Sequence, residues 1–271
     1  MKPTIGICGF GMVGKAVAYG FSLTGDIKIY DINEKISPNT FKEIMKCDYI
    51  FVCVPSPMDL ETGKCNTSIV EETVDKASKY IENTESILII KSTIPPGTTQ
   101  KYIEKYPKCR IVFNPEFLTA RTNLLDFINP ARIILGGSQE NTKKVSELYR
   151  LRFPSTTIFF TDPTSAEMAK YTSNCFLATK VVFFNEIYDI CEALNIDYNE
   201  VIKMVIADGR VGNSHYDVPG HDGDRGVGGS CFPKDINALI YKSWELGLNA
   251  IVMKAVWEKN KRVRKNHDWE H

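Results

Sequence analysis

Short hydrophobic runs alternate with amphipathic segments from the N-terminus to about Phe160. Runs rich in β-branched and aromatic residues predict strands, and apolar residues recurring every three or four positions predict helices. We expect strands at Thr4–Cys8, Ile27–Tyr30, Tyr49–Val54, Ile87–Lys91, Arg110–Phe113, Arg132–Leu135 and Thr157–Phe160. We expect helices between them at Val13–Leu23, Ser68–Glu82, Thr98–Tyr106 and Glu140–Arg150. This alternation is typical of an α/β fold with a parallel sheet covered by helices.

The pattern changes at about Asp162, where capping residues precede a long periodic segment without Gly or Pro. This segment, Ala166–Leu194, predicts one long helix. Further helices are expected at Tyr198–Ala207, Lys234–Leu246 and Asn249–Arg264, and the Gly-rich stretch Gly209–Asp235 predicts a functional loop. We therefore expect two domains, an α/β domain at residues 1–162 and a helical domain at residues 163–271.

Charge and hydropathy exclude two classes of partner. Lys plus Arg and Asp plus Glu both number 33, so the chain lacks the basic excess that nucleic-acid binding requires. The apolar runs are too short to cross a membrane, and no secretion signal precedes the first predicted strand. We expect a cytoplasmic protein. The charged stretch Lys259–Lys265 is expected to be a solvated helix end.

Eight cysteines occur in the sequence, and their spacings do not match those of a zinc site. Cys8, Cys53 and Cys175 lie in apolar runs, where a thiol behaves as a small core residue. Without a secretion signal we expect all eight to be reduced thiols, and we expect no metal.

The first predicted strand runs into the motif Gly9-x-Gly11-x-x-Gly14, and an Ala- and Val-rich helix follows. In a dinucleotide site the first glycine makes a tight turn, the second admits the pyrophosphate and the third lets the helix pack on the strand. Asp31 follows the second predicted strand at the spacing of a carboxylate that binds a ribose 2′-hydroxyl. A carboxylate there would repel a 2′-phosphate, which favours NAD over NADP. The alternative is that Asp31 only caps a turn.

Cys231 is the one thiol whose surroundings suggest chemistry. It follows the glycines of Gly226–Gly229 and directly precedes a predicted helix, three residues before Lys234. A helix N-terminus and a nearby ammonium both favour a thiolate. The alternative is a buried structural cysteine in a loop.

Several ordered blocks of the chain resemble the UDP-glucose/GDP-mannose dehydrogenase family. The blocks are Gly9–Gly14, Cys53–Pro57, Lys91–Thr99, Asn114–Leu118, Glu167–Asn174, Asn185-Glu186, Gly209–Gly212 and Gly226–Asp235. They extend over essentially the whole chain. The resemblance implies a Rossmann-type NAD domain followed by a helical substrate and dimerisation domain.

The resemblance also implies a reaction, the four-electron oxidation of a nucleotide sugar with two NAD, first of all UDP-glucose to UDP-glucuronate. A cysteine nucleophile adds to the intermediate aldehyde, and the resulting thioester is hydrolysed. The matching residue is Cys231, and Asp235 is its polar partner in hydrolysis.

Further roles follow from the same matches. Lys170 is expected to stabilise oxyanion charge, Asn174 to position the substrate or a water, and Glu116 to act in proton transfer. Thr93 is expected to hold the reacting water. The expected substrate contacts are Glu116, Phe117, Leu118, Lys170, Asn174, Arg210, Arg225 and Gly228. The expected cofactor contacts are Gly9, Gly11, Met12, Val13, Gly14, Asp31, Pro55, Ser56 and Thr93.

Two departures from the family pattern leave alternatives open. Ala120 stands where many members carry a second carboxylate, and the chain stops at His271, which predicts a short form without the usual C-terminal nucleotide-binding domain. Arg225 and His221, in a lengthened loop, are then candidates for diphosphate contacts. The alternatives are an NAD-binding protein that has lost turnover and a two-electron hydroxyacid-type dehydrogenase. Because the long helix is rich in apolar positions, we expect a homodimer.

Overall fold

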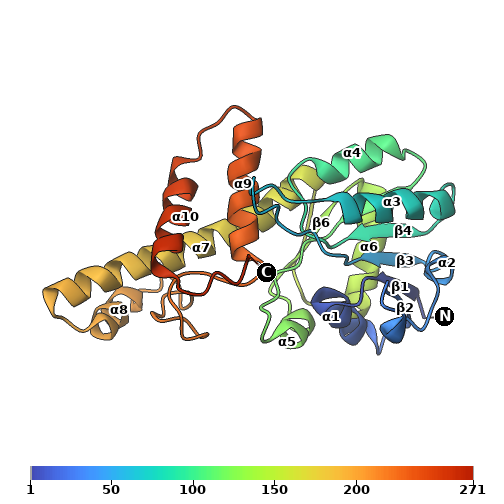
Figure 1. The fold of residues 1–271 in the computed structure, drawn as a ribbon. Coiled ribbons are helices and arrows are strands. Elements are labelled where there is room, and N and C mark those ends of the chain that lie inside the picture. The colour runs from blue at the N-terminus through green and yellow to red at the C-terminus, as the bar shows by residue number, and fades with distance from the viewer. Residues whose placement is uncertain (1, 271) are drawn as a thin grey trace. The chain divides into compact units, whose positions relative to one another are not determined.

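The computed structural model describes residues 2–270, which form two compact units. The first unit comprises residues 2–56 and 66–170, and the second comprises residues 57–65 and 171–270. The first is an α/β unit and the second is helical (Figure 1). The predicted order of an α/β half followed by a helical half is therefore confirmed.

Within the described residues, seven strands of the first unit form one sheet in the order β2-β1-β3-β4-β5-β6-β7. Their bounds are β1 Thr4–Cys8, β2 Asp26–Tyr30, β3 Tyr49–Val52, β4 Ile87–Ile90, β5 Arg110–Phe113, β6 Ile133–Gly136 and β7 Ile158–Thr161. Neighbouring strands are parallel except at β5 and β6, where Phe113 pairs with Gly136 in antiparallel register. The sheet is therefore Rossmann-like and mostly parallel.

Helices cover both faces of this sheet, which explains why strands such as β4 are apolar at every position. One core cluster joins the sheet to α1 (Met12–Phe21), α5 (Asn123–Ile128) and α6 (Gln139–Arg152). The other joins it to α2 (Phe41–Ile44), α3 (Ser68–Ile81), α4 (Thr98–Lys105) and the first turn of α7 (Pro163–Leu194). The short elements α2, α5 and the 3₁₀ turn η1 (Glu34–Ile36) were not predicted from the sequence.

The second unit is built from the rest of α7 with α8 (Tyr198–Ile206), α9 (Phe232–Glu245) and α10 (Ile251–Val263). One apolar cluster packs α7 against α9, and another packs it against α8. The predicted helices are present with ends shifted by a few residues, and the long loop between α8 and α9 precedes Cys231. None of the helices in residues 2–270 is both long enough and apolar enough to span a membrane.

Candidate active site

The turn between β1 and α1 has the geometry that its three glycines predict. Gly9 has φ +92°, and a Cβ on Gly14 would lie 2.0 Å from the carbonyl oxygen of Gly9. A Cβ on Gly11, by contrast, would meet no atom within 4 Å. Gly11 is the N-cap of α1 and therefore leaves open space at a helix N-terminus, where backbone N–H groups attract phosphate. The residues present fit the pyrophosphate of NAD.

Asp31 lies directly after β2, and its carboxylate is bonded to the glycine turn. Its Oδ2 accepts a hydrogen bond from the N–H of Phe10 at 2.6 Å, and its Oδ1 accepts one from the N–H of Asn33 at 2.9 Å. The carboxylate therefore fixes the backbone of the glycine turn at Phe10, the residue before Gly11. Both interpretations of Asp31, as a turn residue and as a ribose ligand, are compatible with these bonds.

The segments after β3 and β4 are tied together by hydroxyl groups. The Ser56 hydroxyl donates to the carbonyl of Thr93 at 2.6 Å, and the Ser92 hydroxyl donates to the carbonyl of Val54 at 2.6 Å. Two of the predicted cofactor contacts, Ser56 and Thr93, are thus brought together at the carboxyl ends of parallel strands. In open α/β sheets this edge is where ligands bind.

Glu116 and Lys170 form a buried ion pair in the first unit. The Lys170 Nζ lies 2.8 Å from Glu116 Oε1, and the N–H of Leu118 donates to Glu116 Oε2 at 2.7 Å. Burial raises the pKa of the Glu116 carboxyl, but the charge and hydrogen bond of Lys170, the Leu118 N–H and the charge of Lys91 outweigh it. The pKa lies below its ordinary value, so Glu116 is ionised at neutral pH and Lys170 faces a full negative charge.

Lys91 and Asn114 are site residues to which the sequence analysis gave no role. The Lys91 Nζ donates to Asn114 Oδ1 at 2.9 Å, and the Tyr149 hydroxyl donates to the same oxygen at 2.5 Å. Together with Glu116 they line a cavity of about 290 Å³. Burial lowers the pKa of Lys91 to about 8. The signal in the sequence was a lysine that ends an otherwise apolar strand.

In the second unit, Cys231 is the N-cap of α9, and Pro233 occupies the first turn of that helix. Asp235 is buried one turn later, where Asn174 Nδ2 donates to its Oδ2 at 2.6 Å and Lys234 Nζ contacts its Oδ1 at 2.5 Å. Burial lowers the pKa of Lys234, but the nearby Asp235, Cys65 and Cys231 outweigh it, and the pKa lies above its ordinary value. The Lys234 ammonium, paired with Asp235, therefore lies near enough to interact with the thiol.

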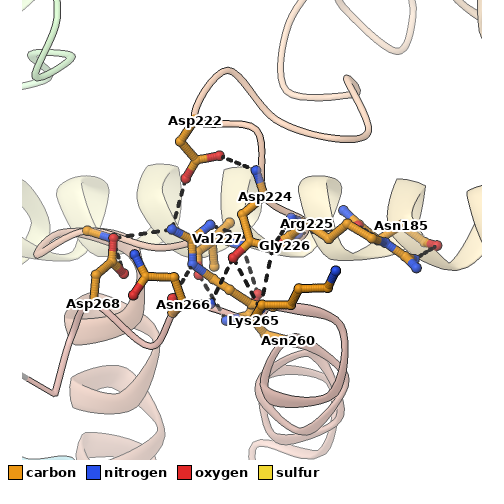
Figure 2. Close-up of polar contacts among 12 residues, drawn as sticks. Asn185, Asp222, Asp224, Arg225, Gly226, Val227, Asn260, Lys265, Asn266 and Asp268 are labelled. Carbon is orange, nitrogen blue, oxygen red and sulfur yellow. Dashed lines mark hydrogen bonds and ion pairs between the residues drawn. The ribbon is translucent and has the colours of Figure 1, made fainter.

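The loop before Cys231 is held from two sides. Arg225 donates to the side chain and carbonyl of Asn185 at 3.1 and 2.9 Å, and pairs with Asp189 at 2.6 Å. Figure 2 shows Arg225 extended toward Asn185 of α7. Gly228, which stays a predicted substrate contact, lies against Arg264, whose Nη2 would be 2.0 Å from a Cβ at this position.

The charged stretch at the end of α10 was expected to be solvated, and this expectation is wrong for two of its residues. Asn260 is wholly buried and Arg264 is 4% exposed. Both are buried because their polar atoms bond to the loop before Cys231.

Arg210 lies in the loop that follows α8, and Lys180 of α7 contacts the same loop. The Arg210 side chain is 88% exposed and pairs with Asp208. Lys180, from α7, donates to the carbonyls of Val211 at 2.9 Å, Gly212 at 3.3 Å and Ser214. Burial lowers the pKa of Lys180, and the three carbonyl oxygens surround its ammonium. The lysine thereby anchors the loop that presents Arg210.

Two profiles of one family match successive parts of this chain. Residues 32–152 match the NAD binding domain of the UDP-glucose/GDP-mannose dehydrogenase family, and residues 164–262 match its central domain. The chain belongs to this family. The predictions of the family and of NAD as its cofactor are therefore confirmed.

Relatives with known names support the same family. The UDP-glucose 6-dehydrogenase of Rickettsia conorii is 33% identical over 83% of this chain and 51% of its own length. A UDP-glucose 6-dehydrogenase of Bacillus subtilis is 33% identical over 82% of this chain and 48% of its own length. The chain thus spans about half the length of the curated relatives it matches.

Solved structures agree with the fold. A UDP-glucose dehydrogenase of Pyrobaculum islandicum superposes with a TM-score of 0.86 at 27% identity, covering 97% of this chain and 68% of that one. A 3-hydroxyisobutyrate dehydrogenase of Mycobacterium tuberculosis superposes with a TM-score of 0.77 at 14% identity, covering 99% and 96%. The second likeness shows the fold alone.

Proposed function

We propose that this chain oxidises the primary alcohol of a nucleotide sugar to a carboxylate with NAD, through a thioester on Cys231. UDP-glucose is the first candidate substrate, because the Rickettsia and Bacillus relatives carry its name. In this proposal residues 1–162 hold the cofactor and residues 163–271 carry the nucleophile. The observation that carries it is Cys231 at the N-cap of α9, one turn before the buried Asp235.

The nucleophile is supported by local electrostatics. A thiol at a helix N-terminus lies near the positive end of the helix dipole, and the charged Lys234 adds to this field. Both effects favour the thiolate, which is the nucleophilic form. Asp235 is held by Asn174 and Lys234, so its carboxylate has a fixed position for the hydrolytic step.

Two NAD molecules, bound one after the other, would each accept one of the two hydrides that a four-electron oxidation releases. The open space over Gly11 would hold its pyrophosphate, and Asp31 would bind its adenosine ribose. After the first oxidation the Cys231 thiol adds to the aldehyde, so that the sulfur bonds to the carbon and the oxygen takes up the proton that the thiol loses. The second oxidation removes a hydride from that carbon and the proton from its oxygen, which leaves a thioester. Water then adds, the carbon–sulfur bond breaks, and the thiolate and a carboxylate are released.

Lys170 and Glu116 supply the charges and protons for these steps. The Lys170 side chain is the proposed donor for the oxygen on which negative charge develops, and its 2.8 Å contact with Glu116 fixes its position. Glu116 accepts the proton of the attacking water, and Thr93 holds that water. Arg225 and His221 remain the proposed contacts of the nucleotide diphosphate, and Arg210 remains a proposed substrate contact. An unchanged KM for the nucleotide sugar in Arg225→Ala would rule out Arg225 as a diphosphate contact.

The stoichiometry of NADH formation tests the reaction. Purified protein is incubated with limiting UDP-glucose and excess NAD, and NADH is quantified by absorbance, with Cys231→Ser as the matched variant. We expect two NADH per sugar from the parent and none of the carboxylate product from Cys231→Ser. One NADH per substrate would instead identify a two-electron dehydrogenase, and NAD binding without NADH from a panel of nucleotide sugars would indicate a protein without turnover.

We also propose that the chain forms a homodimer through α7. Large apolar side chains are exposed along this helix, namely Phe176, Phe183, Ile190 and Leu194. They recur at intervals of seven and four residues, which places them on one side of the helix. Sedimentation equilibrium tests the dimer, and a monomer at micromolar concentration would exclude it.

A further inference from the structure

The segment that follows α10 contacts the backbone of the loop before Cys231. The N–H of Gly229, two residues before the cysteine, donates to Asp268 Oδ1 at 2.9 Å. Figure 2 shows Asp222, Asp224 and Asp268 gathered around the end of α10, with Asn260 and Lys265 beside them. Residues about forty positions apart in the sequence are thus joined by hydrogen bonds.

Arg264 is the centre of this contact. Its Nη2 lies 2.8 Å from Asp222 Oδ2 in the loop and 3.2 Å from Asp268 Oδ2 in the terminal segment. The guanidinium is buried, and a buried charge is tolerated only when it is paired. It fits because Gly228 has no side chain, since a Cβ there would lie 2.0 Å from Nη2. Gly228 therefore leaves room for the guanidinium of Arg264.

Two more contacts fix the loop on the same side. Asp224 Oδ2 accepts the N–H groups of Lys265 and Asn266 at 3.1 and 2.8 Å. The Asn260 side chain accepts from the N–H of Val227 at 2.7 Å and donates to its carbonyl at 3.0 Å. The loop is held through the Asp224 side chain and through the backbone of Val227 and Gly229, up to two positions before the thiol.

We propose that Arg264 and Asp268 are positioning residues that hold Cys231 at the N-cap of α9, by clamping the preceding loop through Asp222 and through the N–H of Gly229. The clamp is needed because Gly226 and Gly229 have positive φ and because glycine-rich backbone visits many conformations when it is free. Only the held conformation keeps the sulfur at the helix terminus. The contribution of the clamp to catalysis rests on the proposed function, whereas its effect on the reactivity of the Cys231 thiol does not.

The reactivity of Cys231 toward iodoacetamide tests the clamp without any sugar substrate. The alkylation rate is followed by peptide mass spectrometry across a pH series, in the parent and in Asp268→Ala, Asp268→Asn and Arg264→Lys. Asp268→Asn keeps an acceptor for the Gly229 N–H, whereas Asp268→Ala removes it. Glu258→Gln breaks an exposed ion pair on α10 and is the matched control.

We expect the pH of half-maximal alkylation to be about half a unit higher in Asp268→Ala than in Asp268→Asn, because both variants lose the same negative charge and only Asp268→Ala also frees the Gly229 N–H. Arg264→Lys keeps its charge and should lie above the parent, while Glu258→Gln should match the parent. A change in exposure alone would alter the rate at every pH without moving this midpoint. The proposal is overturned if Asp268→Ala and Asp268→Asn share one midpoint and Arg264→Lys equals the parent.

Folding and function are separated by two further readouts. If Asp268→Ala does not fold, the Arg264→Lys midpoint decides the matter in the same way. NAD affinity should be unchanged in all variants, because the cofactor residues belong to the first unit. A shifted midpoint in a protein that oxidises no nucleotide sugar would support the clamp and contradict the proposed function.

Discussion

The Lys170 ammonium lies 2.8 Å from the Glu116 carboxylate, and the two side chains are only 4% and 7% exposed. Removing one partner of a buried pair leaves the other charge without compensation, which costs about 3 kcal/mol or more. We therefore expect Lys170→Met to lower the free energy of unfolding in urea by about this amount. The double variant Lys170→Met/Glu116→Gln should recover most of the loss.

The matched control for this pair is Lys108→Met. Lys108 forms an ion pair with Glu82 at 3.2 Å, with side chains 63% and 50% exposed. Exposed pairs contribute less than about 1 kcal/mol, so this variant should unfold almost as the parent does. Equal losses in Lys170→Met and Lys108→Met would show that burial does not govern the strength of the Lys170 pair.

Gly14 and Gly11 should respond to alanine in opposite ways. A Cβ on Gly14 would overlap the carbonyl of Gly9, so Gly14→Ala should destabilise the protein by about 3 kcal/mol. A Cβ on Gly11 meets no atom, and its φ of −75° suits alanine, so the fold should be retained. We expect Gly11→Ala to weaken NAD binding about tenfold or more, measured by NADH fluorescence titration. Unchanged NADH affinity in Gly11→Ala would argue against pyrophosphate at this turn.

Asp31 should govern the choice between NAD and NADP. Asp31→Ala removes a carboxylate that repels a 2′-phosphate and binds ribose hydroxyls, so we expect about tenfold weaker NAD binding and a smaller preference over NADP. The exposed Asp26→Asn in β2 is the control and should bind both as the parent does. An undiminished preference for NAD in Asp31→Ala would assign Asp31 to the turn alone.

Glu167 makes stability depend on pH. It is wholly buried and accepts the N–H groups of Gly97 and Thr99 at 2.6 and 2.7 Å. Burial outweighs these hydrogen bonds and raises the pKa of Glu167 from 4.5 to about 7. Between these two pKa values the folded protein binds more protons than the unfolded chain. The stabilisation that protonated Glu167 contributes is therefore complete below the unfolded pKa and is lost as the pH rises through the folded pKa.

The Glu167→Gln variant isolates this titration. The difference in unfolding free energy between the parent and Glu167→Gln should change by up to about 3 kcal/mol from pH 4.5 to pH 7, to the disadvantage of the parent. Urea unfolding curves at a series of pH values measure it. Two parallel stability profiles would mean that Glu167 titrates near its ordinary pKa.

Most of the sheet could be predicted from the sequence, because strands buried on both faces leave continuous apolar runs such as Ile87–Ile90. The antiparallel pairing of Phe113 with Gly136 could not, since hydrophobic patterns do not record strand direction. The helices Phe41–Ile44 and Asn123–Ile128 were missed because so few residues carry little periodicity.

Some residues of the candidate site could also be predicted from the sequence and others could not. Gly14 and Cys231 were recognisable because a local motif or helix start gives each its meaning. Arg264 was not, because its burial depends on Asp222, which is distant in the sequence. A charged residue within a charged stretch is usually solvated, and only the folded loop reverses that expectation.

Lys180 places a positive charge among the carbonyl oxygens of Val211, Gly212 and Ser214. Many loops of this kind are organised by a bound metal ion, which must be acquired during folding and can be withdrawn by a chelator. Here the cation is the ammonium group of Lys180, which belongs to the chain itself. The order of this loop should therefore be indifferent to EDTA, and should depend instead on whether a single amine keeps its proton.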